Sequence, residues 1–239
     1  MKPKLPAGER LYAVGDIHGR ADLLANLLYQ IEADAAARDA AKTTLVFVGD
    51  YVDRGPDSRG VVELLLNGLP APLDAHFLKG NHEAMLLDFV ADPWRLDHWR
   101  RNGGDATMAS YGVDVAGLRA AKASPEVWHA AFTAALPESH LKFYSSLRLH
   151  VRAGDYLFVH AGLRPGVPLE AQDETDLIWI RHDFLDATEP FGPVVVHGHT
   201  PVDAPAVLPN RIGIDTGAVF TGRLTALWLQ DGERGFLQT

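Results

Sequence analysis

The sequence contains no cysteine in its 239 residues, which excludes disulfides, thiolate metal ligands and a cysteine nucleophile. It also has no apolar stretch close to the roughly 18 residues that a membrane-spanning helix requires. Positive charge is scarce, because 22 Lys and Arg residues stand against 31 Asp and Glu residues and give a formal net charge of -9. No global positive field therefore attracts nucleic acid or an anionic membrane. Any affinity for phosphate must come from a local site.

The first ten residues contain two prolines, charges at both ends and no apolar core. A signal or transit peptide needs such a core or an amphipathic basic helix, so neither is expected here. Together with the absence of cysteine, this composition predicts a cytoplasmic protein. No feature indicates an oligomer, and a monomer is the default expectation.

With 47% hydrophobic and 22% charged residues, the composition is that of a globular protein with enough apolar material for a large core. Short apolar runs and helical patterns alternate in the first part of the chain. The runs lie at 11–14, 44–48 and 76–78, and the helical patterns at 21–38, 58–66 and 83–90. This βαβα order predicts a layered α/β sheet with helices outside it.

Residues 92–146 differ in composition and pattern, because they are helical and rich in Ala, Trp and His. They predict a helical insertion or cap. Strand-like runs then return at 147–151, 156–159, 194–196, 211–214 and 224–229. Several of these runs are close neighbours in sequence, so antiparallel pairing is expected there. We predict one α/β sandwich domain over residues 1–239, with 92–146 inserted within it.

Five apolar runs each end in a compact polar cluster. The clusters occupy residues 15–19, 49–55, 80–83, 160–162 and 197–200. Because the carboxyl ends of strands converge on the ligand crevice of an α/β sheet, these clusters can meet in space. Asp, neutral His and the amide oxygen of Asn are ligands for divalent metals, and sulfur is absent. The pattern therefore predicts a metal site that contains oxygen and nitrogen donors.

The clusters read GDIHG, GDYVDRG, GNHE, VHAG and HGHT in chain order. This order resembles the metal-dependent phosphoprotein phosphatases of the calcineurin-like metallophosphoesterase superfamily, especially bacterial and bacteriophage lambda-type serine/threonine phosphatases. The resemblance runs from about Leu11 to Thr221. It implies a four-layer α/β/β/α sandwich with mixed sheets and a helical insertion.

The resemblance also implies two divalent metal ions, with Mn expected and Fe, Zn, Co or Ni compatible with the donors. One ion would be bound by Asp16, His18 and Asp50. The second would share Asp50 and be bound by Asn81, His160 and His199. His197 lies before the matching histidine and is interpreted as a helper near the site.

The mechanism that the resemblance implies is direct attack of a metal-bridging hydroxide on phosphorus, without a phosphoenzyme. Arg54 and Arg181 would bind the phosphoryl oxygens together with Asn81. His82 is the expected general acid, and Asp53 would orient its imidazole.

Three functions remain open from the sequence. The first is hydrolysis of phosphoserine or phosphothreonine in protein or peptide substrates, with phosphotyrosine also open as a substrate. The presence of Asp53 favours this first function. The second is symmetrical diadenosine tetraphosphate hydrolysis, and the third is an inactive phosphate-binding module. Other hydrolase and nucleotide-binding motifs, such as GxxxxGK[ST], GxGxxG, GxSxG and HExxH, are absent.

Some conspicuous residues have structural interpretations. Asp22 is expected to be an acid at a helix start. Trp94, Trp99 and Trp128 are expected to pack within the helical region, with a minor substrate role open for Trp99. Asp215 is expected to shape the floor of the site without binding metal.

Overall fold

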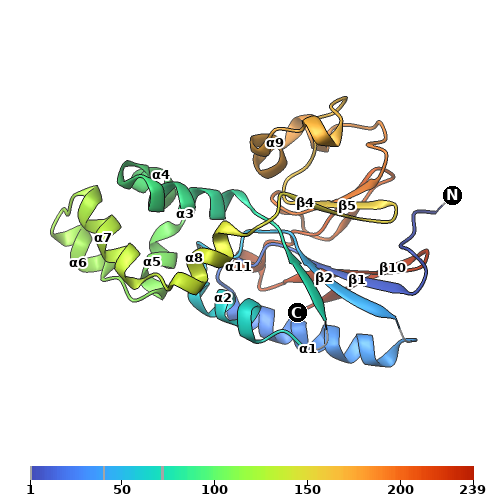
Figure 1. The fold of residues 1–239 in the computed structure, drawn as a ribbon, viewed down its shortest axis with the longest axis horizontal. Coiled ribbons are helices and arrows are strands. Elements are labelled where there is room, and N and C mark those ends of the chain that lie inside the picture. Colours follow the sequence, from blue (N-terminus) through green and yellow to red (C-terminus); the bar gives the residue numbers. More distant parts are fainter. Residues whose placement is uncertain (1, 40, 71–72) are drawn as a thin grey trace.

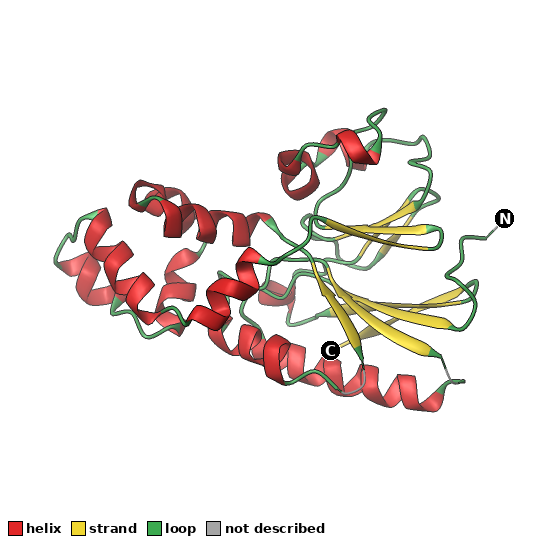
Figure 2. Ribbon diagram, viewed as in Figure 1, coloured by secondary structure: helices red, strands yellow, loops and turns green. Residues whose placement is uncertain are grey.

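The computed structural model describes residues 2–39, 41–70 and 73–239. Within these residues two five-stranded sheets face each other (Figures 1 and 2). The first sheet has the order β10 (Glu233–Gln238), β9 (Thr225–Gln230), β1 (Glu9–Val14), β2 (Lys42–Phe47), β3 (Asp74–Phe77). The second has the order β4 (His150–Ala153), β5 (Tyr156–Val159), β6 (Val194–His197), β8 (Arg211–Gly213), β7 (Ala206–Val207).

Both sheets are mixed. Strands β1, β2 and β3 run parallel, and β9 and β10 continue the first sheet by antiparallel pairing. In the second sheet β5, β6 and β8 are parallel, whereas β4 and β7 pair antiparallel at the edges. The antiparallel pairing expected of close neighbours is confirmed for β4 and β5, whereas β5, β6 and β8, which lie farther apart in sequence, pair in parallel. A long connection with its own helices separates β5 from β6, and such crossovers join parallel strands.

Helices cover the outer face of each sheet. Helices α1 (Ala21–Ala37) and α2 (Ser58–Asn67) pack on the first sheet, and α9 (Glu174–Trp179) and α10 (His182–Leu185) pack on the second (Figure 2). The chain thus forms the α/β/β/α sandwich expected from the sequence. Two shorter turns of helix complete this part, η2 (Leu169–Ala171) and α11 (Ala218–Thr221).

The alternation of side chains along β2 explains the layering. Leu45 and Phe47 belong to the core under α1 and α2, whereas Val46 and Val48 belong to the core between the sheets. Successive side chains of a strand point to opposite faces, so a continuous apolar run is buried on both sides. Helix α2 is amphipathic and buries Val61, Val62 and Leu65. The side chain of Asp57 caps its N-terminus by accepting a hydrogen bond from Gly60 N.

The segment between β3 and β4 is helical, as expected, and extends away from the sheets (Figure 1). Its elements are α3 (Asn81–Ala91), η1 (Pro93–Arg95), α4 (Leu96–Arg101), α5 (Gly104–Ser110), α6 (Val115–Ala120), α7 (Pro125–Ala135) and α8 (Glu138–Ser145). Phe89, Trp99 and Phe132 pack ring against ring at its centre. We call residues 92–146 the helical segment.

Some boundaries differ from the sequence patterns. Strand β4 begins at His150, because the preceding residues form only a single bridge between Leu78 and Arg148. Helices α9 and α10 and strand β10 were not predicted, since each is short or strongly polar. No helix in the described part of the chain is long and apolar enough to cross a membrane.

Candidate active site

The predicted ligands come together where parallel strands end. Asp16 follows β1, Asp50 follows β2, Asn81 begins α3 after β3, and His160 and His199 follow β5 and β6. We call these five residues and His18 the ligand group; all six are buried. Three of them, His18, Asp50 and His199, have positive φ. Such backbone is costly for residues other than glycine and clusters at functional sites.

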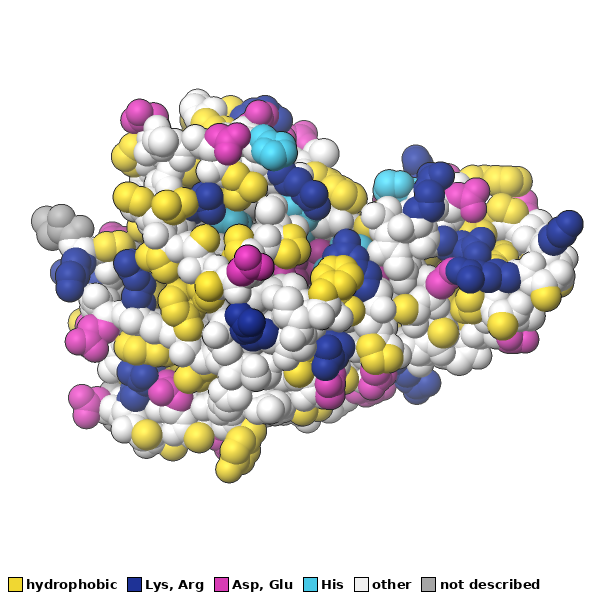
Figure 3. All heavy atoms as spheres, turned by 180° about the vertical axis from the view of Figure 1, so that it is seen from behind, with side chains coloured by type: hydrophobic (Ala, Val, Ile, Leu, Met, Phe, Trp, Pro, Cys, Tyr) yellow, Lys and Arg dark blue, Asp and Glu magenta, His cyan; other side chains and the backbone are white. Residues whose placement is uncertain are grey.

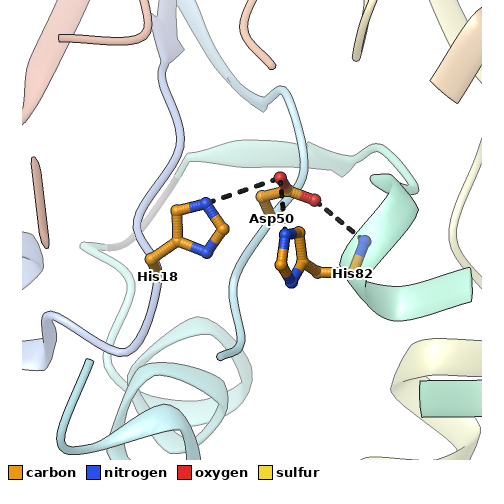
Figure 4. A group of neighbouring side chains, drawn as sticks. All are labelled: His18, Asp50 and His82. Carbon is orange, nitrogen blue, oxygen red and sulfur yellow. Dashed lines mark hydrogen bonds and ion pairs between the residues drawn. The ribbon is translucent and has the colours of Figure 1, made fainter. Parts of the chain in front are cut away.

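Asp50 lies at the centre of the ligand group. Its Oδ2 is 3.5 Å from His18 Nε2 and 3.5 Å from His160 Nε2. Its Oδ1 accepts a hydrogen bond of 3.1 Å from the backbone N–H of His82 (Figure 4). Asp50 Oδ2 therefore lies between two imidazoles, where the bridging role that the resemblance implies would require it to lie.

The imidazoles are oriented by the backbone. The Nδ1 of His18 lies 2.8 Å from Val52 O, and the Nδ1 of His160 lies 2.9 Å from Val48 O. A carbonyl can only accept, so Nδ1 carries the proton and Nε2 presents its lone pair to the site. Burial lowers the pKa of His18 to about 3 and also lowers the pKa of His160. Both rings are therefore neutral near pH 7, as metal binding requires.

Two sets of three residues have donor atoms within 4.8 Å of one another: Asp50, His160 and His199, and His18, Asp50 and His82. The first set matches the predicted second metal, and Asn81 Oδ1 lies 3.0 Å from His160 Nε2 in the same group. In the second set His82 stands where the sequence predicts Asp16. This set therefore does not test Asp16 as a ligand.

Asp16 fits a cation for a further reason. Its Oδ2 accepts from His199 N at 3.0 Å, whereas its buried Oδ1 has no hydrogen-bond partner in the described part of the chain. Burial and the negative charges of Asp215 and Asp50 raise the pKa of Asp16 well above its usual value. A positive ion would satisfy the free oxygen and reverse this effect. A Cβ on Gly198 would collide with Oδ1, so only glycine permits this approach.

His82 forms a buried pair with Asp53. Its Nδ1 lies 2.6 Å from Asp53 Oδ2. Its buried Nε2 has no hydrogen-bond partner among the described residues and lies 3.9 Å from Asp50 Oδ2. Burial alone would lower the pKa of His82, but the charge of Asp50 and the hydrogen bond to Asp53 outweigh it and raise the pKa. The arrangement can therefore hold a proton on Nε2 toward the ligand group.

Two helices of the helical segment hold the carboxylate of Asp53. Trp99 Nε1 on α4 donates to both oxygens at 3.0 Å, and Thr107 Oγ1 on α5 donates to Oδ1 at 2.6 Å. The expectation that Trp99 packs in the interior is correct but incomplete, because its indole N–H also contacts the acid pair. Thr107 was missed, since nothing in the sequence distinguishes a lone buried threonine from any other.

Comparison with known families shows which family this chain belongs to. The family model described as calcineurin-like phosphoesterase matches residues 9–226. The chain belongs to the calcineurin-like phosphoesterase family. The matched range includes every residue of the ligand group, so the superfamily predicted from the sequence is confirmed.

Relatives of this phosphoesterase carry two different activities in their names. Bis(5'-nucleosyl)-tetraphosphatase PrpE (asymmetrical) of Oceanobacillus iheyensis is 28% identical over 233 residues, covering 89% of this chain and 86% of the relative. Serine/threonine-protein phosphatase 1 of Salmonella typhimurium is 30% identical over 225 residues, covering 92% of each. A crystal structure of a "putative diadenosine tetraphosphatase" superposes with a TM-score of 0.65 and 26% identity, covering 100% of this chain and 98% of the other. The chain is thus a metal-dependent phosphoesterase.

Glu83 of this phosphoesterase fixes the loop that carries Asp50, a role that the sequence motif did not reveal. Its Oε2 accepts from the N–H groups of Asp50 and Gly80 at 2.9 and 3.0 Å. Its Oε1 accepts from Tyr51 N at 2.8 Å and Val52 N at 3.3 Å. One buried side chain therefore satisfies four backbone donors in two motifs that are far apart in sequence.

Arg54 and Arg181 lie at opposite ends of the ligand group. Arg54 Nη1 is 2.7 Å from His18 Nε2, and Arg181 Nε donates to His199 Nε2 at 3.1 Å. Both residues are exposed, and Figure 3 shows Lys, Arg and His side chains around a hollow between the two-sheet body and the helical segment. A cation on either Nε2 would displace the guanidinium toward this hollow, where a phosphate can meet it.

His197 lies apart from the ligand group. Its Nδ1 is 3.0 Å from Gly198 O, and its Nε2 is 3.3 Å from Arg211 Nη1. The ring packs edge-on against Phe184 at 5.0 Å. Asp215 forms the floor beside Asp16, where burial raises its pKa to about 6.

We expect Trp99→Phe to lower turnover about tenfold, which corresponds to roughly 1.4 kcal/mol of lost positioning. The ring keeps its packing, but Asp53 loses the indole donor and holds His82 less firmly. Steady-state kinetics and metal content measure the effect, and KM and metal content should stay near wild type. Trp128→Phe is the matched control, because Trp128 is equally buried in the helical segment. Equal losses in both variants would contradict the positioning role.

We expect His197→Gln to reduce the pH dependence of stability. Burial lowers the pKa of His197 to about 3, below the usual value near 6.5. Between these two pH values the unfolded chain binds a proton at His197 that the folded chain does not bind. The free energy of unfolding therefore falls as the pH drops below about 6.5. From about pH 6.5 to 5.5 the wild type should lose roughly 1 kcal/mol of unfolding free energy relative to the variant. Urea denaturation in EDTA measures this difference, and parallel curves would contradict it.

Proposed function

We propose that the protein hydrolyses dinucleoside tetraphosphates at a site that contains two divalent metal ions. The observation that carries the proposal is the pair of exposed guanidinium groups, Arg54 and Arg181, at opposite ends of the ligand group. A row of phosphates presents several charges along its length and suits two separated cations better than a single phosphate does. The curated tetraphosphatases that align with almost the whole chain support the same substrate class.

The metals would be held by oxygen and nitrogen donors from both sheets. We propose Asp16, His18 and Asp50 for one ion, and Asp50, Asn81, His160 and His199 for the other. Such ions supply Lewis acidity and a water molecule of lowered pKa. Mn is the metal that we propose, with Fe, Zn, Co and Ni as alternatives that these donors also suit.

The remaining residues act on the substrate. Arg54 and Arg181 would bind phosphoryl oxygens once they turn from the histidines, and Asn81 would contact a phosphoryl oxygen as well as a metal. His82 would donate the proton on Nε2 to the leaving oxygen, while Asp53 keeps the ring oriented and stabilises its cationic form. This division of roles keeps binding at the rim and proton transfer at the buried centre.

Phosphoprotein hydrolysis is the second candidate, because the buried pair of His82 and Asp53 favours it. Serine and threonine leave as strongly basic alkoxides that need a proton, whereas a departing polyphosphate needs it less. The relative named serine/threonine-protein phosphatase 1 agrees with this candidate.

Rates on two substrates test the proposal. The wild type with Mn is assayed on diadenosine tetraphosphate and on a phosphoserine peptide, and the nucleotide products are separated. We expect the higher kcat/KM on the dinucleotide, with AMP and ATP as products. Two ADP molecules would indicate the symmetrical reaction instead, and faster release of phosphate from the peptide would favour the second candidate. Failure to hydrolyse either substrate or p-nitrophenyl phosphate would indicate an inactive binding module.

We also propose a cytoplasmic location, which the lack of cysteine in the sequence supports. Disulfides are rare in a reducing compartment, so a chain without cysteine suits it.

A further inference from the structure

A pocket of about 380 Å³ lies beside the ligand group, between α3, α4 and α9. Its lining is formed by Ala84, Met85, Asp88, His98, Thr175 and Trp179. None of these residues belongs to the ligand group or to the arginine pair Arg54 and Arg181. The pocket therefore offers binding surface for a part of the substrate other than the reacting phosphate.

Trp179 connects this pocket to the reacting centre. Its indole contacts the ring of His199 edge-on, with the ring centroids 6.0 Å apart. The imidazole of His98 faces it from α4 at 6.5 Å. Trp179 is half-buried and His98 is exposed, so both offer ring surface to an incoming group. A flat aromatic group bound against these rings would be directly adjacent to a phosphate at the ligand group.

The lining also indicates which flat group would bind. Met85 and Ala84 form an apolar wall on α3, one turn beyond His82. Asp88 is exposed at the edge of the same helix, and its carboxylate can accept a hydrogen bond from an exocyclic amine. Stacking surface, apolar contact and an acceptor at the rim are together what an adenine base requires.

We propose that this pocket binds the adenine next to the phosphate that reacts, an inference that rests on the proposed function. A base adjacent to the ligand group places the α-phosphorus of its own nucleotide there, and the reaction then divides the substrate asymmetrically. The water oxygen bonds to the α-phosphorus and the bond to the bridging oxygen breaks. The bridging oxygen leaves with the ATP half and takes the proton from His82, which solvent replaces, while a proton of the attacking water is released to solvent. AMP and ATP are the products.

Trp179→Ala tests the base site by selectivity. We measure kcat/KM for diadenosine tetraphosphate and for inorganic tripolyphosphate, which has no base, and take their ratio. Base stacking on an aromatic ring is expected to make the ratio about tenfold larger in the wild type than in the variant, mainly through KM. Trp179→Phe should restore most of the ratio, and Trp94→Ala, at an exposed tryptophan outside the pocket, should keep the wild-type value.

The outcomes separate the two proposals. If the wild type hydrolyses tripolyphosphate but not the dinucleotide, the proposed function fails and the base site fails with it. If the wild type hydrolyses the dinucleotide and Trp179→Ala keeps the wild-type ratio, only the base site is overturned. Hydrolysis in ¹⁸O-labelled water gives a second readout, because attack at the α-phosphorus places the label in AMP. Label found in ATP would overturn the placement of the base beside the ligand group.

Discussion

His82→Asn is expected to lower turnover by about 10²- to 10⁴-fold on a phosphoserine peptide, the range typical of a lost general acid. The buried Nε2 of His82 has no hydrogen-bond partner within the described structure and lies 3.9 Å from Asp50 Oδ2, while Asp53 holds the other ring nitrogen. Asparagine keeps a polar side chain of smaller size but cannot supply the proton. Metal content and KM should stay close to wild type, because the predicted ligands are unchanged.

The size of this loss should depend on the leaving group. A phosphate chain leaves as a weaker base than an alkoxide, so the same variant should lose less on diadenosine tetraphosphate than on phosphoserine. Turnover on both substrates, measured with equal Mn, provides the comparison. His150→Asn on β4 serves as the control for a histidine outside the site. Near-normal turnover of His82→Asn on phosphoserine would reject His82 as the acid.

Asp50→Asn is expected to prevent the protein from retaining two metal ions. The Oδ2 of Asp50 lies between His18 and His160, so its replacement removes the charge shared by both proposed sites. Loss of a residue that only hydrogen-bonds to a metal ligand typically lowers metal affinity roughly 10–100-fold. Loss of the shared carboxylate itself should lower it more. Elemental analysis after dialysis measures the stoichiometry, and kcat should fall with it.

A control is needed because Asp50 also accepts the backbone N–H of His82. The amide of asparagine can keep this hydrogen bond, so the fold should survive, and circular dichroism checks that it does. Asp22→Asn, at an exposed acid in the first turn of α1, should retain the wild-type metal content. Two equivalents of metal in Asp50→Asn would contradict the bridging role.

The sequence predicted the parts of the fold that depend on local pattern. The buried strands were found because runs such as Thr44–Val48 are apolar on both faces, and the helical segment was found because its period is close to 3.6. The short helices α9 and α10 were missed, as was β10, because their stability comes from packing on a sheet and leaves little local signal. The parallel pairing of β5 with β6 depends on a distant crossover in the same way.

The site was predictable to a similar extent. Ligand candidates such as Asp16 and His199 were identified because each stands in a short motif at a strand end, and the structure brings them together. Glu83, Thr107 and the second role of Trp99 were missed, because their importance comes from a hydrogen-bond partner more than 30 positions away. Sequence patterns identify groups that touch a ligand more readily than groups that hold those groups in place.

The ligand group draws on both sheets, and this has a consequence for how the protein becomes active. Asp50 and Asn81 follow strands of the first sheet, whereas His160 and His199 follow strands of the second. The proposed ions would therefore link the two sheets. Binding that requires the joined sheets stabilises them by mass action. During synthesis no segment released before the final third of the chain can assemble this centre. Metal supply should therefore govern how much newly made protein matures, as well as how fast each finished molecule works.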